Sequence, residues 1–256
     1  MPGHPSLLDF PIALLALCIL LLSVSAWVGV WLRGRSELEG ESREDFGVVL
    51  AAALTLLGLI IGFSFSMATS RYDLRKSLEE AEANAIGTEY VRVDFLSVVE
   101  ASAAKKLLRS YLDARVQWYR ERDTERLRQI DGKTTQLQSA LWSVIKTTAA
   151  AQPNTVLALT VSGMNDVLNA QGYTQAAWWN RIPPAAWILL VVIAVLCNAM
   201  IGYRAAKRKS RALMVMILPV IVSISFYLIA DIDSPRSGVV KVVPQNLLAL
   251  AASLPE

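Results

Sequence analysis

Apolar residues are gathered into four long blocks, and the chain between them is polar or has apolar residues at helical spacing. The first two blocks, residues 10–32 and 46–70, are joined by a short polar stretch. The last two, residues 185–203 and 212–230, are joined by a short basic stretch. A helix needs roughly 20 residues to cross the hydrocarbon core of a bilayer. The pattern therefore predicts four membrane-spanning helices arranged as two hairpins.

The first block also has features of a cleavable signal peptide. Val24-Ser25-Ala26 fits a cleavage site, but no Lys or Arg precedes the block. The apolar run also continues past this site through Trp27 and Trp31, which fit the membrane interface. These features favour a retained membrane helix.

Residues 71–182 form a polar region whose apolar residues recur every three or four positions, without strand alternation. Leu74, Leu78, Ala81 and Ala85 make one such stripe, and Gln152-Pro153 interrupts the pattern between the last two expected helices. The region predicts a soluble bundle of amphipathic helices between the second and third membrane helices.

The ends of the bundle region predict how it connects to its neighbours. No proline separates the second block from the bundle, so residues 46–92 are expected to form one helix, or two barely broken. Trp178, Trp179 and Arg181 suggest a membrane-interface belt before the third membrane helix. After the fourth block, residues 233–256 predict a turn, an extended segment over 238–243 and an amphipathic helix from Pro244.

The fold class is therefore expected to be an all-α membrane protein. Its four membrane helices occupy residues 1–70 and 183–232, and the soluble helical bundle lies between helices 2 and 3. At 54% apolar residues, a chain of 256 residues is too apolar for one soluble domain. The expected partner is the lipid bilayer. The net charge of +3 is not gathered into an aromatic-containing patch, so nucleic acid is not an expected partner.

Residue usage argues against an enzyme. The single histidine, His4, lies near the N-terminus, and Cys18 and Cys197 both lie inside apolar blocks. No nucleophile motif or phosphate-binding glycine loop is present, so no catalytic residue, metal site, cofactor or disulfide is expected. The apolar blocks contain no Asp, Glu, Lys, Arg or His, which disfavours a proton relay.

Basic residues near the membrane ends predict the orientation. Cytoplasmic segments carry an excess of Lys and Arg. The two hairpin loops carry eight basic residues and the opposite side carries six. The eight are Arg33, Arg35, Arg43, Arg204, Lys207, Arg208, Lys209 and Arg211; the six are Arg71, Arg75, Lys76, Arg181, Arg236 and Lys241. The bundle and both termini are therefore expected outside the cytoplasm.

The second block carries small residues at every fourth position, namely Gly58, Gly62, Ser66 and Ser70. This spacing places them on one side of a helix, where a neighbouring backbone can approach closely. Ordinary helix packing is one interpretation. The other is that the stripe, with Phe63 beside it, lines a pore or a narrow neck.

Charged residues cluster where the second helix is expected to leave the bilayer. Arg71 fits a headgroup anchor, and Asp73 could pair with a neighbouring helix. Glu82 and Asn84 fit either a solvated charged face or an ion-selecting ring in an oligomer. All four are candidates for a charged site at the membrane face.

Asp231 and Asp233 follow the fourth block and complete the membrane-face candidates. They either start an ordinary turn or pair with Arg71 or Arg75 on the same side of the membrane. Two aspartates alone are too few for a calcium site, which takes six to eight oxygen ligands.

Two stretches resemble a known family. The strings GLIIGFSFSMATSRYDLRKSLEEAEANAIGTEYVR, residues 58–92, and DIDSPRSGVVKV, residues 231–242, resemble signatures of the bacterial bestrophin-like membrane proteins, a domain family of unknown function. Bestrophins themselves are pentameric anion channels with four membrane helices and a long helical insertion. Their insertion is cytoplasmic, which opposes the orientation expected from the basic residues.

The resemblance implies a multi-pass protein of the bacterial cytoplasmic membrane and a homo-oligomer, by analogy a pentamer. The first functional hypothesis is an ion channel, by analogy for anions, with the second helix lining the pore. The alternative is a membrane-anchored sensory or interaction scaffold whose bundle binds a partner.

Overall fold

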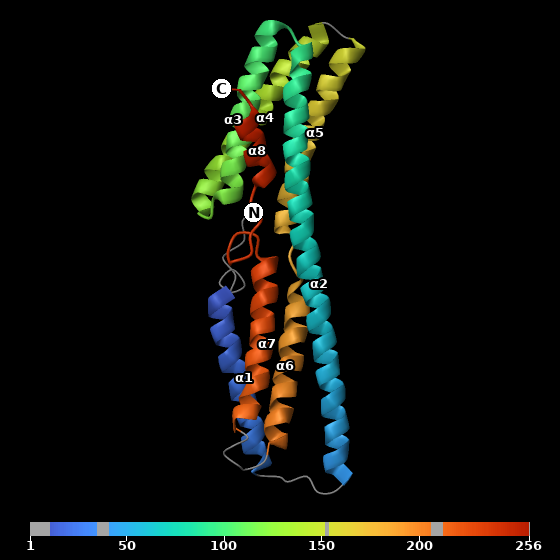
Figure 1. The fold of residues 1–256 in the computed structure, drawn as a ribbon, viewed down its shortest axis with the longest axis vertical. Helices are drawn as coiled ribbons and strands as arrows, with labels where there is room; N and C mark the ends of the chain where they lie inside the picture. The colour runs from blue at the N-terminus through green and yellow to red at the C-terminus, as the bar shows by residue number, and fades with distance from the viewer. Residues whose placement is uncertain (1–10, 35–40, 152–153, 206–211, 256) are drawn as a thin grey trace. The chain divides into compact units, whose positions relative to one another are not determined.

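The computed structural model describes residues 11–34, 41–151, 154–205 and 212–255. These residues contain no β-strand, so the expected all-α class is confirmed. Four segments among them are long and apolar enough to cross a membrane, one for each apolar block. Figure 1 shows α1 (Pro11–Arg33), α2 (Glu41–Arg92), η2 (Val93–Phe95), α3 (Val98–Arg120), α4 (Thr124–Ala151), α5 (Thr155–Trp179), α6 (Pro184–Arg204), α7 (Ala212–Asp233) and α8 (Gln245–Ser253).

The chain divides into two compact units. The first, which we call the membrane unit, comprises Gly3–Ser70 and Arg181–Val240. The second, the helical bundle, comprises Arg71–Asn180 and Lys241–Glu256. The division falls inside α2, which is one uninterrupted helix of 52 residues. Of the two possibilities for residues 46–92, a single helix is therefore correct.

Small residues of α1 and α6 allow close packing in the membrane unit. A Cβ atom at Gly29 would overlap the carbonyl group of Ala199, and one at Gly202 would overlap the carbonyl group of Ala26. The hydroxyl of Ser25 donates a hydrogen bond to the carbonyl oxygen of Val195 over 2.7 Å. Because a side chain at either glycine would separate the backbones, these glycines set the distance between α1 and α6.

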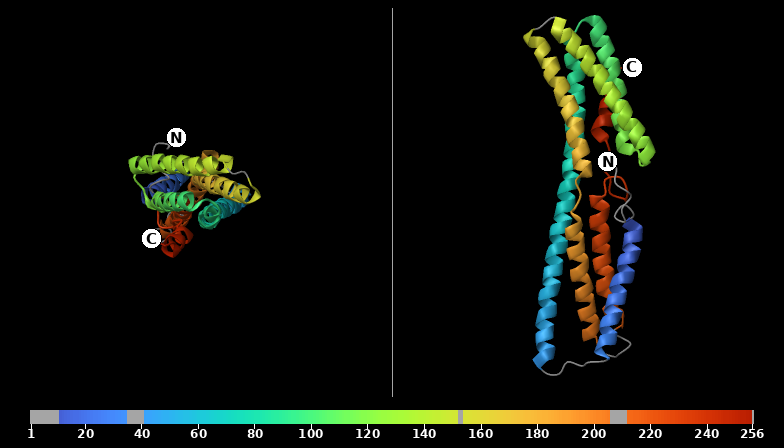
Figure 2. Two further views of the ribbon diagram at one scale, coloured as in Figure 1. Left: turned by 90° about the horizontal axis from the view of Figure 1, so that it is seen from above. Right: turned by 180° about the vertical axis from the view of Figure 1, so that it is seen from behind.

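The bundle has its own apolar core, formed by residues of α2, α3, α4, α5 and α8. Figure 2 shows the ribbons of these helices in two further views. Trp178, at the end of α5, is 4% exposed, and its ring centroid lies 4.7 Å from that of Trp118. The expected place of Trp178 in an interfacial belt is therefore wrong, because the ring packs inside the bundle. Trp179 is 64% exposed.

Several element ends differ from the sequence expectation. Helix α2 begins at Glu41 rather than Phe46, and α7 continues to Asp233. The segment expected to be extended over 238–243 forms bends and coil without a strand, and α8 follows Pro244 as predicted. The expected break at Gln152-Pro153 lies outside the described residues, as do the basic residues Arg35, Lys207, Arg208, Lys209 and Arg211.

Candidate functional site: two faces of α2

The bundle half of α2 buries a row of charged side chains. Positions 75, 79, 82, 86, 89 and 93 are separated by alternating steps of four and three, which places them on one side of a helix. Four of these residues are ionisable and at most 1% exposed, and we call them the charged spine: Arg75, Glu79, Glu82 and Glu89. The expected apolar stripe through Leu74 is wrong at that residue, which is 49% exposed. This face of α2 thus buries charged residues in the same row as the apolar residues Ile86 and Val93.

Arg75 binds the C-terminal end of α5. Its Nε donates to the carbonyl oxygen of Ala177 over 3.2 Å, and its Nη2 donates to that of Asn180 over 3.1 Å. Arg71 donates to the side-chain oxygen of Asn180 over 2.6 Å. The last carbonyl groups of a helix lack partners within it and carry partial negative charge, so a guanidinium satisfies them and compensates that charge.

Glu79 binds the N-terminal end of α8. One carboxylate oxygen accepts the backbone amide of Leu247 over 2.9 Å, and the other accepts the Asn246 amide group over 2.7 Å. A carboxylate at this end satisfies free N–H groups and compensates the positive end of the helix dipole. This contact fastens the C-terminal helix to α2.

Glu82 forms a fully buried ion pair with Arg115 of α3. Its carboxylate also accepts hydrogen bonds from the hydroxyls of Tyr119 and Thr174, each over 3.2 Å. Burial alone would lower the pKa of Arg115, but the Glu82 carboxylate outweighs this and raises it. The Arg115 guanidinium lies 4.6 Å from the ring centroid of Trp118. Both surface interpretations of Glu82 are therefore wrong, because it belongs to the bundle core.

Glu89 differs from the other members of the spine. Among the described residues, neither of its carboxylate oxygens has a hydrogen-bond partner, although the residue is 0% exposed. Burial raises the pKa of Glu89 to about 8, and Arg92 opposes this shift only in part. A carboxyl group in this setting is mostly protonated at neutral pH.

The opposite face of α2 is exposed in both units. In the membrane unit it carries the four predicted candidates Gly58, Gly62, Phe63 and Ser66. Phe63 is 64% exposed, and a Cβ atom at Gly58 or Gly62 would meet no heavy atom within 4 Å. Within the part of the chain that the structure describes, this stripe therefore takes no part in helix packing.

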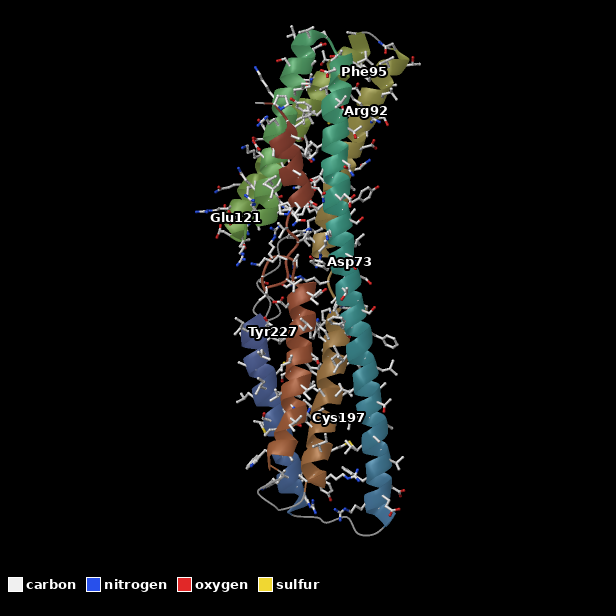
Figure 3. All side chains as sticks on the ribbon, in the orientation of Figure 1. Asp73, Arg92, Phe95, Glu121, Cys197 and Tyr227 are labelled. Atoms are coloured by element: carbon white, nitrogen blue, oxygen red, sulfur yellow. The ribbon has the colours of Figure 1, made fainter. Side chains whose placement is uncertain are left out.

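In the bundle, the same helix exposes a row of polar residues: Asp73, Ser77, Glu80, Asn84 and Thr88. Asp73 lies near the start of the bundle part of α2, and Arg92 lies at its end (Figure 3). Asp73 and Asn84 are exposed, whereas Glu82 of the same predicted group is buried. These five residues follow one another at three or four positions. In the sequence they therefore continue the stripe of small residues that begins at Gly58.

Asp231 and Asp233 organise the segment after α7. The Asp231 carboxylate accepts the backbone amides of Val239 and Val240 at 2.8–3.1 Å. Gly238 has φ +104°, and a Cβ atom there would overlap the Asp231 carboxylate, so only glycine fits this turn. Asp233 accepts the amide of Ile182 over 3.1 Å. Arg71 belongs to the other unit, and its pairing with these aspartates stays a prediction.

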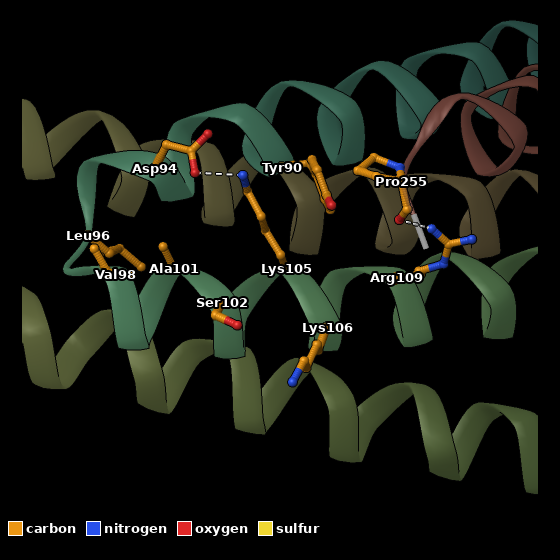
Figure 4. Close-up of a pocket in the computed structure, with 10 residues that line it drawn as sticks. All are labelled: Tyr90, Asp94, Leu96, Val98, Ala101, Ser102, Lys105, Lys106, Arg109 and Pro255. Atoms are coloured by element: carbon orange, nitrogen blue, oxygen red, sulfur yellow. Dashed lines mark hydrogen bonds and ion pairs between the residues drawn. The ribbon is translucent and has the colours of Figure 1, made fainter.

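A cavity of about 420 Å³ opens on the bundle between the end of α2, α3 and the C-terminal residues (Figure 4). Lys105 is paired with Asp94 over 2.6 Å and lies 5.1 Å from the Tyr90 ring centroid. Arg109 donates to the carbonyl oxygens of Leu254 and Pro255. Lys105 and Arg109, two basic residues that line the cavity, therefore already have partners. We assign the cavity no ligand.

The charged spine was missed because apolar spacing was used to find the buried face. A signal was nevertheless present in the sequence. Arg75, Glu79, Glu82 and Glu89 keep the spacing of a buried helix face, and they alternate with the polar residues of the opposite face. The row they form also contains the apolar residues Ile86 and Val93, and this shared spacing is the signal that could have indicated the buried face.

The model of the bestrophin-like domain matches residues 16–247, which is most of the chain. The chain belongs to the bestrophin-like family. The family resemblance of the two sequence signatures is thereby confirmed. No curated protein matches the bestrophin-like chain.

Solved structures give the same fold. A bacterial bestrophin homologue from Klebsiella pneumoniae is 16% identical to the bestrophin-like chain, with a TM-score of 0.63. The match covers 95% of this chain and 99% of that one. A variant of that homologue with one substitution is 14% identical, with a TM-score of 0.64 and the same coverage. At such identity the likeness establishes the fold alone.

Proposed function

We propose that several copies of this chain form an ion channel in which the exposed face of α2 lines the conduit. The chemistry of that face carries the proposal. A surface that faces lipid is normally apolar, whereas this stripe contains Gly58, Gly62 and Ser66 in the membrane unit. Its continuation in the bundle is polar. Small and polar residues along one side of a helix suit a water-filled path.

The low coverage of α2 supports an assembly of several copies. In the most apolar membrane-length window of α2, 11% of the window is buried within the chain. In the corresponding windows of the other three spans, the buried share is 33–44%. Neighbouring copies would supply the missing contacts of this helix. The chain belongs to the bestrophin-like family. By analogy with bestrophins, which are pentameric channels, this membership supports an assembly of several copies.

Charge on the exposed face favours cations rather than the anions suggested by analogy. The row in the bundle carries Asp73 and Glu80, and Lys76 at its edge is the one exposed base between them. Each copy thus contributes a net negative charge over this stretch. Rings of acidic side chains attract cations and repel anions.

The test is a conductance measurement on purified protein in planar bilayers, with a KCl gradient to read ion preference. We expect a cation-selective current. The double variant Asp73→Asn with Glu80→Gln should shift the reversal potential toward that of an unselective pore. Asp113→Asn, which removes an exposed acid on α3, is the matched control and should leave the reversal potential unchanged.

Two outcomes would overturn the channel proposal. A monomer in mild detergent would leave α2 without copies to form a conduit. An assembled oligomer without ion current would favour the scaffold hypothesis, in which the bundle binds a partner. By analogy with the bacterial bestrophin-like family, we place the assembly in the bacterial cytoplasmic membrane. The basic residues in the hairpin loops favour an orientation with the bundle outside the cytoplasm.

A further inference from the structure

Glu89 is the one member of the charged spine without a hydrogen-bonded partner among the described residues. Arg75, Glu79 and Glu82 each bind at least two groups of another element. Glu89 instead faces Gly163 of α5, where a Cβ atom would overlap its carboxylate. The absent side chain of this glycine leaves the space that the carboxyl group fills.

Two charged groups face Glu89. Arg92, on its own helix, lies over the same glycine, because a Cβ atom at Gly163 would come within 2.6 Å of its Nη1. Asp166 approaches from α5, and its carboxylate lies 3.8 Å from the same guanidinium nitrogen. Arg92 and Asp166 are 32% and 63% exposed, so water reaches the Arg92–Asp166 pair and not Glu89.

We propose that Glu89 is a proton-binding site that holds α2 against α5 while it is protonated. An ionised carboxylate at this position would be buried without a hydrogen bond, which is costly. The neutral acid avoids most of that cost. The pKa of Glu89, raised to about 8 by burial, is consistent with a protonated carboxyl group at neutral pH. The proposal does not depend on whether the protein conducts ions.

Loss of the proton would change the contacts around Gly163. The new negative charge would attract Arg92, whose guanidinium now pairs with Asp166. It would also require water to enter between α2 and α5. Proton release should therefore loosen this contact, and the loosening should begin as the pH approaches about 8.

The direction of the effect on stability follows from proton linkage. The folded state holds the Glu89 proton up to about pH 8, whereas an unfolded chain releases it near the ordinary pKa of a glutamate, about 4.3. The stabilisation of the folded state by the proton on Glu89 is complete below about pH 4.3. This stabilisation declines as the pH rises to about 8 and is absent above that value.

The experiment compares thermal unfolding of the full-length protein with that of Glu89→Gln between pH 6 and 9, in one detergent. Glutamine imitates the neutral acid and cannot lose a proton. Relative to the variant, the parent protein should lose about 5 °C in Tm between pH 6 and 8, with no further relative change above pH 8. Asp113→Asn removes an exposed acid on α3, outside the proposed conduit, and should keep the pH dependence of the parent.

A parallel pH dependence of parent and Glu89→Gln would overturn the proposal. A second measurement needs no variant and covers the case in which Glu89→Gln fails to fold. After correction for the intrinsic exchange rate, amide protection around Gly163 in the parent protein should fall as the pH passes 8. Constant protection from pH 6 to 9 would equally overturn it.

Discussion

At the scale of single residues, the bundle shows how buried charge is made tolerable. Two charges removed from water each lose several kcal/mol of hydration, which only close pairing and further hydrogen bonds restore. Glu82 has Arg115, Tyr119 and Thr174 as partners, and all four side chains are buried. Such a cluster favours this arrangement of α2, α3 and α5, because the hydrogen bonds of its buried groups form together in it.

A double-mutant cycle at Glu82 and Arg115 tests this account. Glu82→Gln or Arg115→Met alone leaves a buried polar group or charge without its partner, so each should cost about 3–5 kcal/mol of unfolding free energy. The double variant should cost clearly less than the sum of the two. Denaturant unfolding of the purified protein measures all four states.

The matched control is the exposed pair of Arg128 and Glu125 on α4, at 2.8 Å and 60% and 64% exposed. Water and salt screen such a pair, so the same cycle there should give under about 1 kcal/mol of coupling. Equal coupling energies at the two pairs would contradict the role assigned to the buried cluster.

At the scale of elements, some features of α2 can be predicted from the sequence pattern and others cannot. Its existence and its passage from apolar to polar surroundings follow from composition. The absence of proline left two possibilities, one helix or two barely broken, and the structure has one. Its buried face in the bundle does not, because apolar periodicity assumes that charges face water. Arg75 and Glu79 are buried because α5 ends against Arg75 and α8 begins against Glu79. These contacts arise from tertiary structure, so the sequence of α2 alone does not predict them.

The membrane helices show the same division. Four spans were predictable from hydropathy, whereas the choice of packing surface was not. The every-fourth-residue stripe on α2 was the evident packing signal, yet the close contact of the membrane unit lies at Gly29 and Gly202. Single glycines on two helices are recognised as a contact only when the helices are placed together.

Leucine substitutions at Gly202 and Gly62 distinguish packing within a copy from packing between copies. Gly202→Leu would force its side chain into the backbone of α1, so little folded protein should be recovered. Gly62→Leu has room within the protomer, so a folded protein should be recovered whose oligomer or conductance is impaired. Yield, size-exclusion chromatography and bilayer recording are the measurements. Normal assembly and conductance of Gly62→Leu would show that the stripe faces lipid.

At the scale of the whole molecule, the family and the number of spans follow from local signatures, but the orientation in the membrane depends on a charge difference. The hairpin loops carry eight basic residues and the opposite side six. Each Lys or Arg near a span resists transfer across the membrane, and the side with the excess stays cytoplasmic.

Cysteine labelling in intact cells tests the orientation. Ser139, on α4, is exposed, and Cys18 and Cys197 are buried, so a new cysteine at Ser139 should dominate the signal. We expect Ser139→Cys to react with a membrane-impermeant maleimide before lysis, because the bundle is predicted outside the cytoplasm. Ser42→Cys, exposed at the start of α2 beside the hairpin loop, is the matched control and should react only after lysis. The reverse labelling pattern would place the bundle in the cytoplasm, where the acidic row of α2 would then meet the cytoplasmic ions.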